Sequence, residues 1–213
     1  MGHTPDHTDG TANASPHLWR NGWYAAARQV PSPNFGPRPE QARITLAVIH
    51  SISLPPGEYG GSEIEQLFTN QLDWSAHPYF EQIRGAEVSA HFVIRRDGEI
   101  VQFVSVDDRA WHAGRSSWLG LDNCNDYSVG IELEGLEDTP FEPAQYTALA
   151  TLIDALKQRC PIDQIAGHEH IAPGRKRDPG KAFDWAHLQQ LTDWPAAHLA
   201  GLCTQTPGTA HDA

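Results

Sequence analysis

Residues 45–52 of the 213-residue chain read TLAVIHSI, an apolar run that contains a single histidine near its end. A short run rich in branched residues is typical of a strand that is buried on both faces of a sheet. We therefore predict a buried strand over residues 44–49, which would hold His50 rigidly at its end. On this segment alone His50 has two interpretations, a packed structural histidine or a metal ligand.

The chain around this run alternates between strand and helix patterns. Residues 90–96 and 99–104 flank Asp97-Gly98, a dipeptide typical of a β-hairpin turn. Residues 128–134 (SVGIELE) predict another strand. Helices are predicted to begin at a Ser62 capping box, at Pro143 (ending near Arg159) and at Asp184 (ending near Asp193). This order predicts an α/β domain with a mixed central β-sheet flanked by helices.

The two ends of the chain differ in composition from its middle. Residues 1–17 are polar and lack an apolar period, which predicts a disordered tail. Residues 197–213 finish in a similar polar stretch and are predicted to be a flexible C-terminal tail. We therefore predict one domain over residues 18–196, a size that suffices for a proper hydrophobic core.

The charge balance excludes several partners. The formal net charge is -12, with 27 acidic and 15 basic residues, which argues against nucleic acid and against an anionic membrane surface. Apolar runs stay well short of the roughly 20 residues that span a bilayer. The first residues do not have the pattern of a secretory signal peptide. Three cysteines without a CxxC pair argue against a disulfide framework, so we expect a cytoplasmic monomer with reduced thiols.

A second polar segment, residues 167–180 (GHEHIAPGRKRDPG), adds two histidines, a lysine and an aspartate to His50. Two imidazole nitrogens and one carboxylate oxygen make a three-ligand zinc site with one open coordination position, as catalytic sites have. If the segment is extended, His168 and His170 point in opposite directions, so at most one of them is a ligand. Asp178 and Lys176 have ordinary alternatives, a turn residue and a surface lysine.

The strand at 128–134 carries two glutamates on an otherwise apolar background. Alternation places Gly130, Glu132 and Glu134 on one face and the three apolar residues between them on the other. Glutamate is a poor β-former, and a buried carboxylate is costly unless it is paired or functional. Either this face is exposed to solvent or Glu132 has a chemical role. His91 and His112 fit packing histidines or the wall of a substrate cleft.

Several blocks of sequence, in one order, carry a family resemblance. They are residues 27–33 (ARQVPSP), 88–91 (VSAH), 109–114 (RAWHAG), 124–135 (CNDYSVGIELEG) and 176–185 (KRDPGKAFDW), together with the His50 segment. The chain resembles the zinc-dependent N-acetylmuramoyl-L-alanine amidases of the peptidoglycan-recognition fold over about residues 23–185. It is most similar to the cytoplasmic AmpD-type enzymes, which cleave 1,6-anhydro-N-acetylmuramyl peptides during cell-wall recycling.

The resemblance implies a role for each candidate residue. It implies that His50, His168 and Asp178 bind one Zn²⁺, and so selects His168 over His170. It implies that Glu132 is the general base and that Lys176 is the cation that stabilises the oxyanion. The implied substrate is a muropeptide, cleaved at the amide bond between muramic acid and L-alanine.

Two positions depart from the family pattern. Ser51 follows the first zinc histidine where close relatives have asparagine, and Asn123 stands where an arginine could bind the carboxylate of the stem peptide. Both concern peptide recognition rather than the metal chemistry. Two other functions are compatible with the resemblance, a non-catalytic peptidoglycan-binding module and an amidase that acts on polymeric wall. A zinc assay separates the first of these from an enzyme.

Overall fold

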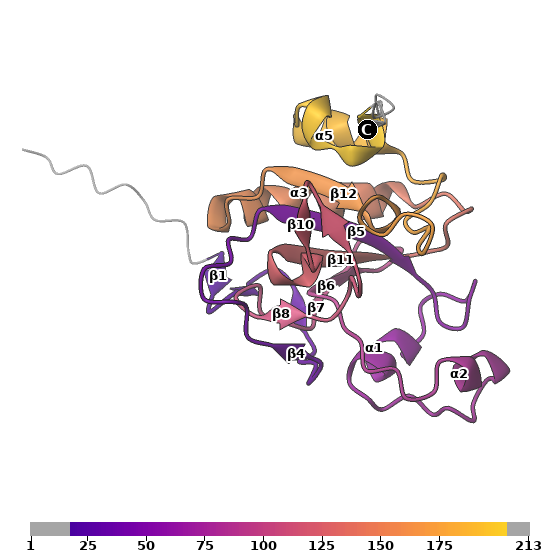
Figure 1. Ribbon diagram of the computed structural model, residues 1–213. Helices are drawn as coiled ribbons and strands as arrows, with labels where there is room; N and C mark the ends of the chain where they lie inside the picture. The colour runs from indigo at the N-terminus through magenta and orange to yellow at the C-terminus, as the bar shows by residue number, and fades with distance from the viewer. Residues whose placement is uncertain (1–17, 204–213) are drawn as a thin grey trace, which may run out of the picture.

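The computed structural model describes residues 18–203 (Figure 1). The predicted tail at residues 1–17 lies outside the described residues, as do residues 204–213. Within the described part, no helix is both long and apolar enough to cross a lipid bilayer.

A mixed sheet forms the centre of the domain, as the sequence predicted, and it has six strands. Its order is β12 (Gln164–Gly167), β5 (Leu46–Ile52), β11 (Ser128–Glu134), β6 (Phe92–Ile94), β7 (Ile100–Gln102) and β3 (Arg28–Gln29). The first four strands run parallel, β7 is antiparallel to β6, and β3 is parallel to β7. The apolar runs of β5 and β11 thus form the two inner strands of the parallel part of the sheet, where both faces are covered.

Two helices cover one face of this sheet. Figure 1 shows α5 (Trp185–Thr192) stacked on α3 (Pro143–Arg159), with α3 next to the sheet. Ile49, Ile131 and Leu133 are fully buried beneath them, in the largest apolar cluster of the domain. The predicted alternation along residues 128–134 is therefore confirmed, and Glu132 and Glu134 face away from α3.

A smaller apolar layer lies under the hairpin of β6 and β7. It contains α1 (Glu63–Phe68) and α2 (Pro78–Gln82), whose Phe68 and Phe80 pack with Val93 and Phe103. Both helices lie in the lower right of Figure 1, away from α3 and α5. The remaining elements are short: β1 (Trp19–Arg20), β2 (Trp23–Tyr24), β4 (Phe35–Gly36), β8 (Arg109–Ala110), β9 (Ser117–Trp118), β10 (Leu121–Asp122), α4 (His168–Ile171) and the 3-10 turns η1 (Cys124–Asp126), η2 (Ala196–His198) and η3 (Ala200–Leu202).

The predicted helix starts are confirmed, with one difference in capping. Asp184 accepts a hydrogen bond from the backbone N–H of His187 at 2.9 Å, as an N-cap should. Ser62 precedes α1 but makes no cap hydrogen bond. Its hydroxyl instead accepts from Nε2 of Gln66 at 3.0 Å, so the predicted capping box is wrong in its chemistry.

Two predicted boundaries also change. The hairpin pairs only residues 92–94 with 100–102, because Arg95 N–H bonds to the carbonyl of Glu99 at 2.9 Å and closes a five-residue turn in which Gly98 has φ +89°. At the other end, Leu199 is fully buried in the main core and forms an isolated bridge with Ile165. The domain therefore continues past the predicted boundary at residue 196, because the side chain of Leu199 packs in the main core.

Candidate active site

The candidate site lies where the central parallel strands end, on the sheet face opposite α3. His50 falls inside β5 rather than after it, and the register of the ladder pairs it directly with Glu132 of β11. Paired residues of neighbouring strands point to the same face of a sheet. The carboxyl ends of parallel strands are the usual place for ligand sites in open α/β sheets.

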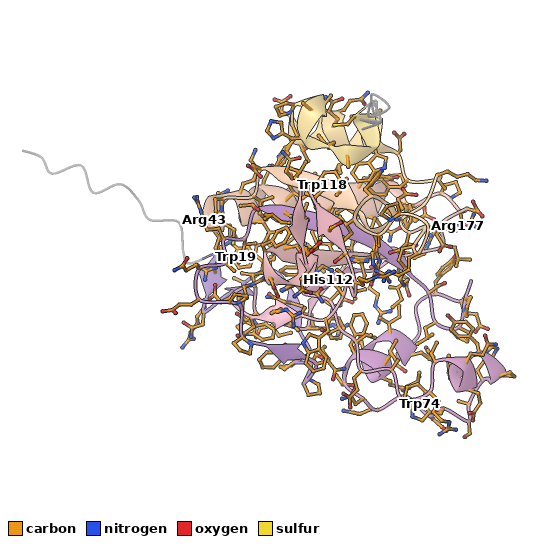
Figure 2. The ribbon with its side chains drawn as sticks, viewed as in Figure 1. Trp19, Arg43, Trp74, His112, Trp118 and Arg177 are labelled. Atoms are coloured by element: carbon orange, nitrogen blue, oxygen red, sulfur yellow. The ribbon has the colours of Figure 1, made fainter. Side chains whose placement is uncertain are left out.

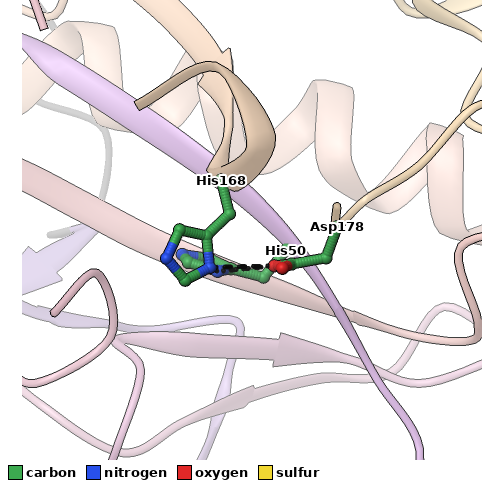
Figure 3. A group of neighbouring side chains, drawn as sticks. All are labelled: His50, His168 and Asp178. Atoms are coloured by element: carbon green, nitrogen blue, oxygen red, sulfur yellow. Dashed lines mark hydrogen bonds and ion pairs between the residues drawn. The ribbon is translucent and has the colours of Figure 1, made fainter. Parts of the chain in front are cut away.

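Three side chains from distant parts of the chain converge there. His50 comes from β5, His168 from the start of α4, and Asp178 from the loop that follows (Figure 3). The two Nδ1 atoms are 2.9 Å apart, and Oδ2 of Asp178 lies 3.1 Å from Nδ1 of His50 and 3.0 Å from Nδ1 of His168. All three residues are buried, with 1%, 3% and 8% exposure.

The hydrogen bond on the far side of the His168 ring decides which of its nitrogens is free. Nε2 of His168 lies 3.0 Å from the carbonyl oxygen of Ala113, which can only accept, so Nε2 carries the proton. Nδ1 of a neutral His168 then presents a lone pair to the centre of the cluster. Such a contact from the outer nitrogen is the usual way in which a metal-binding histidine is oriented.

Charge and donor chemistry both fit a divalent cation. Burial lowers the pKa of His50 to about 4, so this imidazole is neutral at pH 7. Asp178 adds a carboxylate oxygen 3.1 Å from Nδ1 of His50 and 3.0 Å from Nδ1 of His168. Donor atoms of these three residues lie within 4.8 Å of one another, and two nitrogens with one oxygen suit zinc.

His170 does not belong to this cluster. Residues 168–171 form a helical turn, so the condition for strand alternation, an extended segment, is not met. Nδ1 of His170 accepts from the backbone N–H of Gly167 at 2.9 Å, and its ring packs edge-on against Trp185. The helical turn, and not strand alternation, is what separates the two histidines.

The cluster opens into a cavity of about 380 Å³ whose walls include Glu132 and Lys176. A neighbouring hollow of about 310 Å³ shares His168, Lys176, Trp111 and His112 with it. The two hollows therefore form adjoining parts of one cleft along Trp111. All five residues for which the sequence predicted a role contribute to this cleft.

A larger cavity, of about 620 Å³, lies elsewhere and is a poorer candidate. Most of its charged wall residues are already paired: Arg28 with Glu65 and Glu99, and Arg95 with Glu65 and Glu134. His50, His168 and Asp178 do not line it. Paired charges of this kind hold surrounding segments together and leave little polar capacity for a ligand.

The two glutamates of β11 have different surroundings. Within residues 18–203, the buried Oε2 of Glu132 has no hydrogen-bond partner. Burial, and then the charge of Asp178, raise the pKa of Glu132 well above its usual value, while Lys176 opposes the shift. An unpaired carboxylate with a raised pKa that faces a cleft is the expected form of a general base.

Glu134 is fully engaged in the structure. Its side chain accepts from Nη1 of Arg95 at 3.1 Å, from the backbone N–H of Gly60 at 2.6 Å and from that of Arg96 at 3.2 Å. These bonds tie the loop that follows β5 to the hairpin. Glu132 is therefore the β11 carboxylate that remains available for chemistry.

The remaining candidates occupy structural or peripheral positions. Nδ1 of His91 accepts from the N–H of Gly130 at 3.0 Å, which makes it a packing histidine. Ser51 lines the main cavity, whereas Asn123 is exposed and donates to Asp126 at 2.9 Å. Sequence reasoning missed the carbonyl of Ala113 and the guanidinium of Arg175, which donates to it at 2.7 Å. A backbone acceptor leaves no signal in residue types, so no sequence pattern could have identified it.

The fold and the residues that line the cleft fit an amide hydrolase. The chain belongs to the N-acetylmuramoyl-L-alanine amidase family, whose sequence model matches residues 40–181. The sequence is 52% identical to the 1,6-anhydro-N-acetylmuramyl-L-alanine amidase AmpD of Citrobacter freundii, over 85% of this chain and 97% of that protein.

Solved structures agree with this assignment. The crystal structure of a selenomethionine derivative of AmpD superposes with a TM-score of 0.80 at 53% identity, covering 82% of this chain and 98% of that one. A complex of the Escherichia coli amidase AmiD with anhydro-N-acetylmuramic acid-L-Ala-D-gamma-Glu-L-Lys is 30% identical, with a TM-score of 0.51 and coverage of 72% and 60%. The prediction of an N-acetylmuramoyl-L-alanine amidase is thus confirmed.

Proposed function

We propose that the enzyme holds one Zn²⁺ through His50, His168 and Asp178 and cleaves the amide bond between 1,6-anhydro-N-acetylmuramic acid and L-alanine in muropeptides. Peptidoglycan recycling is the process that such a reaction serves. The observation that carries the proposal is the convergence of three donor atoms beside the unpaired carboxylate of Glu132 in one cavity. The name of the 52% identical relative and the ligand in the AmiD complex support the choice of substrate.

The residues around the cluster divide the chemistry between them. When bound, zinc supplies Lewis acidity at the carbonyl and lowers the pKa of water toward about 7. Glu132, which lines the same cavity as the three ligands, accepts the proton of the attacking water. The pairing of Glu132 with His50 across the ladder keeps this base beside the ligand cluster.

Lys176 and Glu132 complete the cycle. Lys176 stands at the rim of the cavity, two residues before Asp178, and its ammonium stabilises the negative charge that develops on the carbonyl oxygen. Glu132 then delivers its proton to the nitrogen of the departing L-alanine. The muramyl sugar and the peptide separate as products.

We also propose that the enzyme works as a monomer in the cytoplasm on soluble muropeptides. Cys124 and Cys160 are buried free thiols and Cys203 is an exposed one, so all three cysteines are unpaired. Reduced thiols of this kind support a reducing compartment. The formal charge of -12 gives nucleic acid and anionic membranes little attraction for the chain.

Product analysis tests the substrate. We expect purified enzyme to release free peptide from a 1,6-anhydro-muropeptide at least tenfold faster than from intact sacculi. Mass spectrometry measures the released peptide in both reactions. The same muropeptide with a reduced, non-anhydro muramic acid is the matched substrate control. Faster cleavage of sacculi would show an enzyme of polymeric wall, and equal rates on the two muropeptides would show that the anhydro ring is not recognised.

Replacement of Lys176 by alanine tests the oxyanion role. Because the cation acts mainly in the transition state, we expect hydrolysis to slow by about 10²–10³-fold while zinc content and muropeptide binding change little. Single-turnover rates and equilibrium binding separate the two effects. Lys181→Ala is the control, since Lys181 is exposed and pairs with Asp138 at 3.2 Å. A collapse of binding with an intact chemical rate would instead make Lys176 a substrate anchor.

A further inference from the structure

His112 links a candidate metal ligand to the interior of the protein. His112 lies near the middle of the molecule in Figure 2. Its ring is edge-on to the ring of His50. Nδ1 of His112 is 2.9 Å from Nε2 of His50, and Nε2 of His112 is 3.1 Å from the hydroxyl of Ser128. The Ser128 hydroxyl is in turn 2.6 Å from the carbonyl oxygen of Cys124. Four groups thus form one unbranched chain of hydrogen bonds that ends at a backbone acceptor.

The backbone end fixes the direction of the whole chain. The Cys124 carbonyl cannot donate, and two oxygens at 2.6 Å repel unless a proton lies between them, so the single proton of Ser128 points to Cys124. Ser128 must then accept from Nε2–H of His112. The ring nitrogens of His112 contact an imidazole and a hydroxyl rather than a carboxylate, so it is a neutral ring with one N–H.

The protonated nitrogen of His112 also determines that of His50. A neutral His112 protonated at Nε2 has a bare Nδ1, which accepts from Nε2–H of His50. His50 then has no proton on Nδ1, the atom that faces His168 and Asp178. The alternative tautomer would place a proton on Nδ1 of His50, directed at Asp178 at 3.1 Å, and any metal would have to displace it.

The surroundings hold His112 in this place. Gly130 lies under the ring, where a Cβ atom would stand 2.4 Å from Cγ of His112. The buried amide oxygen of Asn125 accepts from the backbone N–H of His112 at 3.2 Å and of Ala113 at 2.8 Å. One amide therefore positions two consecutive residues, whose side chain and carbonyl contact the outer nitrogens of His50 and His168 respectively.

We propose that His112 and Ser128 are positioning residues that fix the tautomer of His50, so that its Nδ1 lone pair is available to the metal. This inference rests on the zinc centre proposed above. It assigns to Ser128, which is fully buried and touches no ligand, an effect on metal affinity that acts through two hydrogen bonds. Outer partners of this kind typically change metal affinity or activity by 10–100-fold.

The test measures zinc affinity and tautomer separately. We expect Ser128→Ala to raise the zinc dissociation constant by about 10–100-fold in competition with a chromogenic chelator. Ser128→Thr, which keeps the hydroxyl, should restore most of the affinity. Ser116→Ala is the matched control, because Ser116 is also buried and its hydroxyl accepts from Cys124 N–H at 3.1 Å but contacts no histidine. It should leave zinc affinity unchanged.

Nitrogen-15 NMR of the histidine rings in the wild-type protein gives an answer that does not depend on a variant folding. We expect His112 to be protonated at Nε2, both before and after zinc is added. A proton on Nδ1 of His112, or equal zinc affinity in Ser128→Ala and the wild type, would overturn the inference. Failure of the wild type to bind zinc would instead overturn the proposed function, so the two failures are distinct.

Discussion

Replacing His168 with alanine is expected to leave the purified protein without zinc and without amidase activity. Only His50 and Asp178 would remain as donors, and a catalytic zinc site normally has three protein ligands. The lost imidazole is also the one whose outer nitrogen is held by the Ala113 carbonyl. Metal analysis by mass spectrometry after gel filtration measures the effect directly.

His170→Ala is the matched control for this prediction. His170 lies two residues away in the same helical turn, but it bonds to Gly167 and packs on Trp185. We expect this variant to keep one zinc per chain, with at most a modest loss of stability. Equal zinc loss from both variants, or from neither, would show that the metal is held by another set of residues.

Glu132→Gln is expected to keep the zinc and the fold while lowering turnover by about 10²–10⁴-fold, the usual contribution of a positioned base. Glutamine has nearly the same shape but cannot accept a proton. The wild type and the variant should bind the muropeptide with similar affinity. Turnover close to the wild-type rate in the zinc-loaded variant would assign proton transfer to another group.

The same substitution has a pH-dependent effect on stability in the metal-free protein. Because the folded-state pKa of Glu132 lies well above 4.5, the folded chain binds a proton that the unfolded chain releases as the pH rises past 4.5. The wild type therefore loses stability between that pH and its raised folded-state pKa, and Glu132→Gln does not. We expect the variant to gain stability relative to the wild type over this range, as urea unfolding at several pH values would measure.

Glu134→Gln tests whether the loss of turnover is specific to Glu132 or follows from the loss of either carboxylate of β11. Glu134 satisfies Arg95 and two backbone N–H groups, so its replacement weakens a buried network. We expect a loss of about 1–3 kcal/mol in the free energy of unfolding, with normal turnover in the folded fraction. A severe catalytic defect in a stably folded Glu134→Gln would reverse the assignment of the two glutamates.

The sequence predicted the sheet well because its central strands are distinctive. The apolar runs that became β5 and β11 are buried by helices on one side and by the site on the other, and such burial leaves an unambiguous pattern. Short elements were harder to predict from the sequence. The four residues of α4 are too few for a helical period to show, and the packing of Leu199 rests on a single apolar residue near the chain end.

Residue types indicated the members of the candidate site, but not what each is free to do. Glu132 and Glu134 look alike in the sequence, and only their partners distinguish them, since Arg95 and Gly60 come from other segments. His112 was expected only as a packing or wall residue, because its position between His50 and Ser128 depends on three-dimensional contacts. The roles proposed for all these residues remain predictions for the experiments above.

The pairing of His50 with Glu132 across adjacent parallel strands also bears on how this enzyme can diversify. The hydrogen bonds of the ladder fix the spacing between the proposed ligand and the proposed base. Trp111 and Lys176 line the same cleft from segments outside the sheet. Substitutions in those loops can therefore change the fit of a peptide or sugar, in nature or in directed evolution, while the spacing of the proposed ligand and base stays the same.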